Sequence, residues 1–300
     1  MVGNFEGSLA NRGEYLALSK PDDVVSLNSF GDPETNRIHM VIAEAVYRDE
    51  DRWHQWADGG GSSLELTDPA ADPLEPSNWA DSDETAKAPW TTVSFTGTLD
   101  HGMGSRPPDR FQIGLMGAGE CLVDDVEFFK TGGVNLLSNP GFEASSGWEF
   151  AGNHFRSRLQ TGEAYAGNRC LRVVGQGDGD TGPNCVRSDI AVTPAASGQG
   201  TIRAKVRWLR GWPELLMRTR GNWIEAYARM TLPTNLGTPG QGNSRLLVNA
   251  GPVITGVRHS PVLPAANEVV TVTARVADPD GLASISLRFR VDPGTTSSTL

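Results

Sequence analysis

Short runs of β-branched and aromatic residues, each ended by glycine or proline, are the feature that most limits what this chain can fold into. The 300 residues contain 35 glycines and 19 prolines, which break long helices and favour tight turns. The runs between them are rich in Val, Ile, Thr and aromatic residues, which is the composition of strands. The sequence therefore predicts an all-β fold, and its length allows about two domains.

The charge and the two ends of the chain narrow the class of protein. The formal net charge is −10, and nucleic-acid binding needs basic surface to displace counterions, so we expect no nucleic-acid partner. The sequence lacks both a long apolar run and a signal peptide, so we expect no membrane insertion. The final strand-like run lacks partner strands. We therefore expect a fragment of a longer protein, truncated at both ends.

Four motifs in residues 1–85 occur in the order found in lamin tail domains. They are "GEYLAL" at Gly13–Leu18, the tryptophans Trp53 and Trp56, "GSSLEL" at Gly61–Leu66, and Asn78-Trp79. The closing motif of that family comes much later, as "LGTPGQGNS" at Leu236–Ser244. Residues 1–85 and 234–250 therefore resemble the C-terminal part of a bacterial lamin tail domain. The resemblance implies a partial immunoglobulin-like sandwich.

Residues 86–233 hold a separate set of strand-like runs. The pieces "LVDDVEF" (122–128) and "NLLSNPGFE" followed by "SGW" (135–148) resemble the last and first strands of jelly-roll carbohydrate-binding modules of families 4, 9 and 22, in reversed order. We interpret the segment as one circularly permuted β jelly roll inserted in a surface loop of the lamin tail domain. The alternative is the tail of one module and the head of another. An insert predicts that residues 83–90 lie close to residues 233–238.

The last segment, residues 251–300, resembles the start of an immunoglobulin-like or cadherin-like repeat. An alternating "VVTVTARV" run is followed by a "DPDG" turn and a further alternating run. The segment is too short for a whole repeat. We expect a truncated immunoglobulin-like strand set.

The run "TIRAKVRWL" (201–209) alternates apolar and basic residues, which predicts a strand with one buried face. The buried face is predicted to hold Ile202, Ala204, Val206 and Trp208. The outward face is predicted to hold Arg203, Lys205 and Arg207. Residues 201–230 contain seven Lys or Arg against two Asp or Glu, so a basic outer face is expected.

Two tryptophans near this strand, Trp212 and Trp223, are candidates for a sugar-stacking surface. An indole ring offers a plane to the apolar face of a pyranose, and neighbouring polar groups fix the hydroxyls. We therefore predict a carbohydrate-binding site formed by these tryptophans with the three outward basic residues of 201–209. The alternative is that both tryptophans pack against the lamin tail domain.

The jelly-roll resemblance also implies a structural calcium ion, because such modules often hold one near the first and last strands. Asp124, Asp125 and Glu143 lie in the two matching motifs, and calcium takes hard oxygen ligands. The alternative is that these carboxylates accept hydrogen bonds from turn amides.

The three cysteines are an odd set for an exported protein. Cys170 and Cys185 flank the loop "GQGDGDTGP" almost symmetrically. A hairpin at this loop places them opposite each other and predicts a disulfide bond. The alternative is that these two cysteines and Cys121 are buried thiols.

No arrangement of catalytic residues stands out. None of the five histidines has metal-ligand spacing, and the adjacent Asp124 and Asp125 do not converge on one bond, because neighbouring strand residues face opposite ways. We therefore expect a non-catalytic extracellular or cell-surface segment that serves carbohydrate binding or adhesion through the jelly roll. Its expected partners are a polysaccharide or a cell-surface glycan and the neighbouring domains of its full-length chain. The alternatives are an architectural protein-interaction module without a sugar site and the accessory region of a larger enzyme.

Overall fold

The computed structural model describes residues 8–49, 53–99, 107–180, 182–195, 197–221, 224–290, 294 and 298–299. Within these ranges the regular structure is β, apart from two single-turn 3-10 helices, η1 (Pro76–Asn78) and η2 (Gly152–His154). The predicted all-β fold class is confirmed. The chain divides into two compact units, each described by itself.

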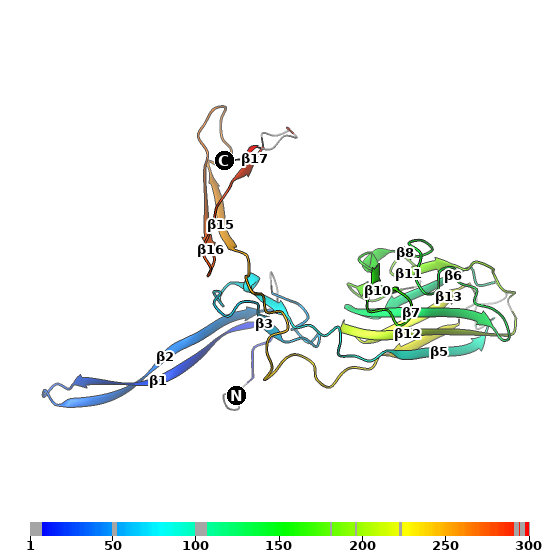
Figure 1. Ribbon diagram of the computed structural model, residues 1–300, viewed down its shortest axis with the longest axis horizontal. Helices are drawn as coiled ribbons and strands as arrows, with labels where there is room; N and C mark the ends of the chain where they lie inside the picture. Colours follow the sequence, from blue (N-terminus) through cyan, green and yellow to red (C-terminus); the bar gives the residue numbers. More distant parts are fainter. Residues whose placement is uncertain are drawn as a thin grey trace. The chain divides into compact units, whose positions relative to one another are not determined.

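The larger unit comprises Gln55–Ser63 and Asp81–Gln241, and we call it the sandwich unit. Two five-stranded antiparallel sheets form it (Figure 1). The first sheet has the order β5 (Thr91–Thr98), β12 (Gln199–Gly211), β7 (Gly119–Lys130), β10 (Arg169–Gly175) and β9 (Arg158–Thr161). The second has the order β14 (Glu225–Arg229), β13 (Glu214–Arg220), β6 (Arg110–Leu115), β11 (Val186–Asp189) and β8 (Glu149–Phe150).

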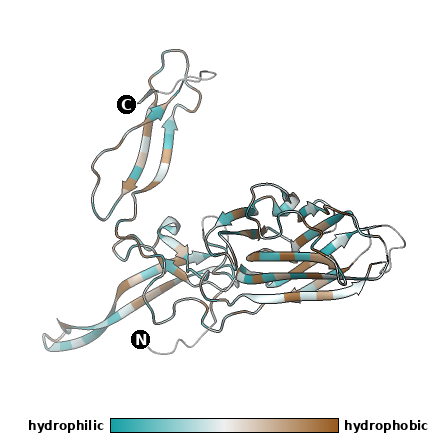
Figure 2. Cartoon of the chain, turned by 45° about the vertical axis from the view of Figure 1, so that its right-hand side comes forward, coloured by the Kyte–Doolittle hydropathy of each residue, from teal (hydrophilic) through white to brown (hydrophobic). Residues whose placement is uncertain are grey.

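The core of the sandwich unit lies between its two sheets. Buried side chains of both sheets belong to one apolar cluster, and the rings of Phe111 on β6 and Phe128 on β7 approach to 6.4 Å between centroids. The predicted alternation of β12 is confirmed: Ile202, Ala204, Val206 and Trp208 are all buried. Figure 2 shows the alternation of hydrophobic and hydrophilic residues along the strands of the sandwich. The inward apolar residues therefore fix which side chains of β12 face outward.

The two predicted insertion junctions lie side by side. Lys87 donates from Nζ to the carbonyl of Gly237 and forms an ion pair with Glu84 at 2.9 Å. The carboxylate of Glu84 accepts the amide N–H of Gly237 at 3.2 Å. The proximity of residues 83–90 and 233–238 that a single-loop insertion requires is therefore present, although the domain boundaries at 86 and 233 stay predictions.

The second unit comprises Met1–His54, Leu64–Ala80 and Gly242–Leu300, and we call it the hairpin unit. Its longest element pairs two strands over 15 registered positions, and most of their side chains are exposed. Its two-stranded sheets are β1 (Gly13–Leu27) with β2 (Pro33–Arg48), β3 (Leu64–Leu66) with β4 (Trp79–Asp81), β15 (Val253–Ser260) with β16 (Thr271–Ala277), and β17 (Arg288–Phe289) with β18 (Ser298–Thr299). The predicted "DPDG" turn follows β16, where Gly281 donates its N–H to the carbonyl of Asp278 at 3.2 Å.

Candidate binding groove

A groove of about 690 Å³ lies on the outward face of the β5–β12–β7 sheet. Its polar lining consists of Thr92, Asp125, Glu127, Asn135, Tyr165, Arg203 and Lys205. Strand pairing explains why these residues meet. Arg203 lies opposite Glu127 of β7, and Lys205 lies opposite Thr92 of β5, so cross-strand neighbours on one face come into contact.

An aromatic ring stands beside this groove. Tyr165 belongs to the β9–β10 loop (residues 162–168), and 47% of the residue is exposed. The Nζ of Lys205 lies 4.6 Å from the centre of its ring, within the range of a cation–π interaction. The half-buried ring of Trp90 meets Tyr165 nearly edge-on, at 5.8 Å and 66°. The ring is therefore held by neighbours and still partly open to solvent.

The groove carries both signs of charge. Arg203 forms an ion pair with Glu127, and this hydrogen bond raises the pKa of the Arg203 guanidinium. Lys205 donates to the hydroxyl of Thr92 at 2.8 Å, and within the described ranges no carboxylate is ion-paired with it. Asp125 adds a second carboxylate to the lining. The groove therefore offers hydrogen-bond donors and acceptors in nearly equal numbers.

Among the predicted sugar-site residues that the structure describes, two line the groove. Arg203 and Lys205 line the groove, and Arg207 lies farther along the same outward face, with its Nε buried and without a hydrogen-bond partner. Trp212 is seven residues beyond Lys205, about 23 Å along an extended strand. Trp223 lies outside the described residues. Neither Arg207 nor Trp212 lines the groove, so a single site formed by Trp212 with these basic residues stays a prediction.

Trp212 is half exposed at its own position, and Trp208 is buried as predicted. Trp212 has 47% exposure and Trp208 has 1%. One side of the Trp212 indole packs on backbone, because a Cβ added at Gly117 would lie 2.5 Å from its Cγ. Its Nε1 donates to Glu214 at 3.1 Å. Trp212 is thus a surface residue fixed at the end of the sandwich.

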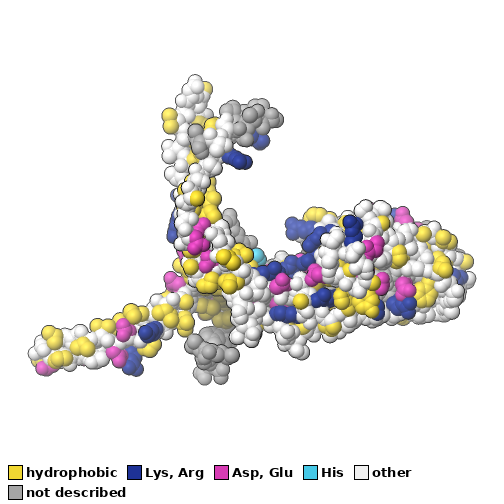
Figure 3. Space-filling view, in the orientation of Figure 1, with side chains coloured by type: hydrophobic (Ala, Val, Ile, Leu, Met, Phe, Trp, Pro, Cys, Tyr) yellow, Lys and Arg dark blue, Asp and Glu magenta, His cyan; other side chains and the backbone are white. Residues whose placement is uncertain are grey.

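The expected basic outer face is largely neutralised by ion pairs. Five of the seven basic residues in 201–230 have a carboxylate partner, and three of those carboxylates come from outside this stretch. The pairs are Arg203–Glu127, Arg210–Glu120, Arg218–Glu225, Arg220–Asp109 and Arg229–Glu214. Figure 3 shows acidic and basic side chains intermingled on the sandwich unit. The local charge count was misleading because strand pairing brings acids from distant parts of the chain.

The three predicted calcium ligands are not gathered into a metal cluster. Among the described residues no group of three or more His, Cys, Asp or Glu is arranged to hold a metal. Asp124 accepts the amide N–H groups of Tyr165 and Ala166 at 2.8 and 3.1 Å. Glu143 accepts those of the two residues that follow Gly167, and Asp125 lines the groove. Asp124 and Glu143 therefore accept hydrogen bonds from turn amides, which is the alternative to calcium binding.

The predicted disulfide between Cys170 and Cys185 is wrong, since both are free thiols. Cys170 is on β10 of the first sheet and packs with Leu122 on that sheet's outward side. Cys185 directly precedes β11 of the second sheet and contacts Gln112 there, with 3.5 Å between Sγ and Nε2. The chain crosses between sheets after β10 instead of forming a hairpin, so the cysteines lie on opposite sides of the sandwich.

Thiol titration provides a direct check of this correction. We expect three free thiols per denatured chain prepared without reductant. In the native protein we expect slow reaction, because burial raises the pKa of Cys170 to about 12 and also raises that of Cys185, and the thiolate is the reactive form. A titre of one thiol in the denatured chain would restore the disulfide.

Sequence reasoning missed Tyr165 and Trp90. Tyr165 sits in "TGEAYAGN", where two glycines bound a short loop. The glycines indicate a turn, but nothing local shows that the turn folds over the outward face of β12. That position depends on pairings between strands far apart in the sequence.

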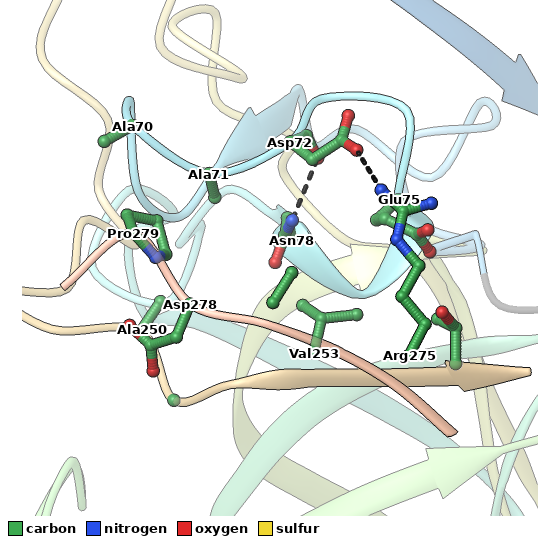
Figure 4. Close-up of a pocket in the computed structure, with 13 residues that line it drawn as sticks. Ala70, Ala71, Asp72, Glu75, Asn78, Ala250, Val253, Arg275, Asp278 and Pro279 are labelled. Atoms are coloured by element: carbon green, nitrogen blue, oxygen red, sulfur yellow. Dashed lines mark hydrogen bonds and ion pairs between the residues drawn. The ribbon is translucent and has the colours of Figure 1, made fainter. Parts of the chain in front are cut away.

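A second hollow, of about 310 Å³, lies within the hairpin unit (Figure 4). Asp72 and Arg275 face each other across it at 4.0 Å, and Asn78 donates from Nδ2 to the carbonyl of Asp72 at 2.9 Å. None of its lining residues is aromatic. The hollow therefore lacks the stacking surface that the groove of the sandwich unit has.

Comparison with protein-family models, with curated proteins and with solved structures finds no match to this chain. The described residues contain no helix that is long and apolar enough to cross a membrane. The fold and the groove define an all-β protein with a two-sheet sandwich that has a polar, aromatic-flanked groove on one face.

Proposed function

We propose that the sandwich unit is a non-catalytic carbohydrate-binding module and that the groove beside Tyr165 is its site. The observation that carries the proposal is a partly open aromatic ring next to paired and unpaired charges on the face of a regular sheet. A pyranose has an apolar C–H face and a rim of hydroxyls that both donate and accept. The groove offers a surface for each part.

The balance of charge favours a neutral polysaccharide over an acidic one. Arg203 and Lys205 supply donors, and Asp125 and Glu127 supply acceptors, so the four formal charges of the lining cancel. Hydroxyl groups match such a mixed set, whereas a polyanion would meet two carboxylates. The calcium ion is not part of this proposal, because Asp124 and Glu143 already accept backbone hydrogen bonds.

The wider identification is part of the same proposal. The two sheets agree with an inserted jelly roll, and the hydrogen bonds between residues 84–87 and 237 agree with insertion through one loop. We propose on this basis a lamin tail domain that carries a carbohydrate-binding-like module, in an extracellular or cell-surface protein. The motifs quoted above support it.

Replacing Tyr165 with Ala tests the site. We expect at least tenfold weaker retardation of the chain on gels that contain a neutral polysaccharide, because loss of stacking and of apolar contact amounts to about 1.4 kcal/mol or more. Trp212→Ala is the matched control, since it removes a half-exposed aromatic ring outside the groove and should leave retardation unchanged. Binding should persist in high salt, which screens exposed charges.

A reversed result would place the site elsewhere. If Trp212→Ala abolishes retardation and Tyr165→Ala does not, the groove is not the binding site. If the wild type ignores a broad panel of neutral and acidic glycans, the carbohydrate proposal fails.

One observation favours the alternative, architectural function. The β1–β2 hairpin exposes large apolar side chains along both strands, including Val25, Leu27, Val41 and Ile42, each at least 50% exposed. An isolated two-stranded hairpin is marginally stable in water. A module that ignores all glycans would therefore be assigned to assembly through this hairpin.

A further inference from the structure

The β9–β10 loop that carries Tyr165 has few backbone-to-backbone hydrogen bonds to fix its position. Within the loop, Gly162 donates its N–H to the carbonyl of Asn168 at 3.1 Å and closes the base. The tip has no such backbone partner among the described residues. The position of Tyr165 over the groove therefore depends on what holds the tip.

Two carboxylates from other parts of the sandwich unit hold it. Oδ2 of Asp124 accepts the amide N–H groups of Tyr165 at 2.8 Å and of Ala166 at 3.1 Å. Oε1 of Glu143 accepts those of Asn168 at 2.7 Å and of Arg169 at 3.1 Å. Four backbone donors of the loop and its exit, on either side of Gly167, thus end on two side chains, in charge-assisted hydrogen bonds.

Asp124 is fixed by its own surroundings. It is fully buried on β7, at an irregularity in the pairing of β7 with β12. Its second oxygen, Oδ1, accepts the amide N–H of Asp125 at 2.8 Å. Both oxygens are therefore engaged, and Asp124 connects the floor of the groove to the loop above it.

Glu143 fits the loop only because residue 167 is glycine. Gly167 has a φ of +67°, and a Cβ added there would lie 2.1 Å from Oε1 of Glu143. The carboxylate occupies the space that any side chain at this position would need. Glycine also tolerates the left-handed backbone that this turn requires.

We propose that Asp124 and Glu143 are positioning residues that clamp the β9–β10 loop and hold the Tyr165 ring in place for the ligand. The inference rests on the proposed function for its ligand, but the clamp itself is independent of it. A ring that is already ordered spares the ligand the entropic cost of ordering it. The clamp gives Asp124 and Glu143 a role that needs no metal.

Amide hydrogen exchange and glycan affinity of the full chain test the clamp together. Glu143 is exposed, so Glu143→Ala should leave the thermal midpoint nearly unchanged. We expect faster exchange at the amides of Asn168 and Arg169, and affinity about three- to tenfold weaker. Glu143→Gln should restore both, because its amide oxygen can still accept both N–H groups. Glu163→Ala, which removes an exposed acid from the same loop, is the matched control and should change neither.

Gly167→Ala tests the same contact from the other side. The added methyl group displaces the Glu143 carboxylate and also strains the left-handed turn, so exchange and affinity should change at least as much as in Glu143→Ala. Exchange that is unchanged in Glu143→Ala overturns the clamp, and faster exchange with full affinity overturns its role in binding. A wild type that binds no glycan overturns the proposed function, while the exchange data still decide the clamp.

Calcium provides the remaining arm of the test. With the clamp made of hydrogen bonds alone, neither chelator nor millimolar calcium should change the exchange of the loop amides. Slower exchange and a higher thermal midpoint in calcium would show that the carboxylates serve a metal, and would overturn the proposal.

Discussion

Trp208→Ala is expected to lower the free energy of unfolding of the sandwich unit by about 3–5 kcal/mol, as large core truncations do. The Trp208 side chain is 1% exposed and lies on β12, which pairs with strands on both sides. Its Nε1 donates to the carbonyl of Gly211 at 3.0 Å. A Cβ added at Gly61 would lie 2.7 Å from the ring, so the indole is packed to contact. Alanine leaves a cavity and an unpaired carbonyl.

The matched control is Trp212→Ala, four residues along the same segment. Trp212 is 47% exposed and has one hydrogen bond, to Glu214, so we expect a loss of about 1 kcal/mol. Urea unfolding followed by far-ultraviolet circular dichroism measures both. Equal losses in the two variants would show that the buried packing of Trp208 is not what stabilises the sheet.

The strands of the sandwich unit were predictable because their signal is local. The period-two alternation in residues 201–209 depends only on which face of β12 meets the core, and the structure buries every apolar residue of that run. A single buried face is enough to fix the outward direction of Arg203 and Lys205. Local pattern therefore identified two residues of the groove.

The rest of the site could not be predicted, because it depends on pairings between distant segments. Lys205 meets Thr92 across 113 residues of sequence, and Arg203 meets Glu127 across 76. The error at Cys170 and Cys185 has the same origin. Two strands that flank a glycine-rich loop look like a hairpin in the sequence, but β10 and β11 belong to different sheets.

A second large effect is expected from the buried imidazole of His154. It should make the free energy of unfolding decrease in acid. His154 is 0% exposed in η2, and its Nε2 accepts the amide N–H of Leu115 at 2.9 Å. Its Nδ1 lies 2.6 Å from Oδ1 of Asn153, so Nδ1 is the protonated nitrogen and donates to that oxygen. A second proton on Nε2 would face the N–H of Leu115, donor against donor.

Burial accordingly lowers the pKa of His154 to about 4, and Asp180 offsets this only in part. The unfolded chain has the ordinary pKa of about 6.5, so between these values the unfolded state takes up a proton that the folded state does not. The free energy of unfolding is therefore not reduced by His154 above about pH 6.5. As the pH falls toward 4, proton uptake by the unfolded chain lowers it by about 3 kcal/mol in total. Carboxylates with lowered pKa values, such as Glu120, cause a further loss of stability at lower pH.

Comparing the wild type with His154→Gln separates the imidazole from those carboxylates. The amide of Gln can still accept the N–H of Leu115 but does not titrate, so we expect a variant that is less stable at pH 7.5 and whose stability falls less between pH 6.5 and 4.5. The difference between the two urea-unfolding profiles should shrink steadily over that interval, because the carboxylates contribute equally to both proteins. Parallel profiles, or a His154 resonance that titrates near pH 6.5 in the folded protein, would show that the imidazole is not held neutral by its burial between Leu115 and Asn153.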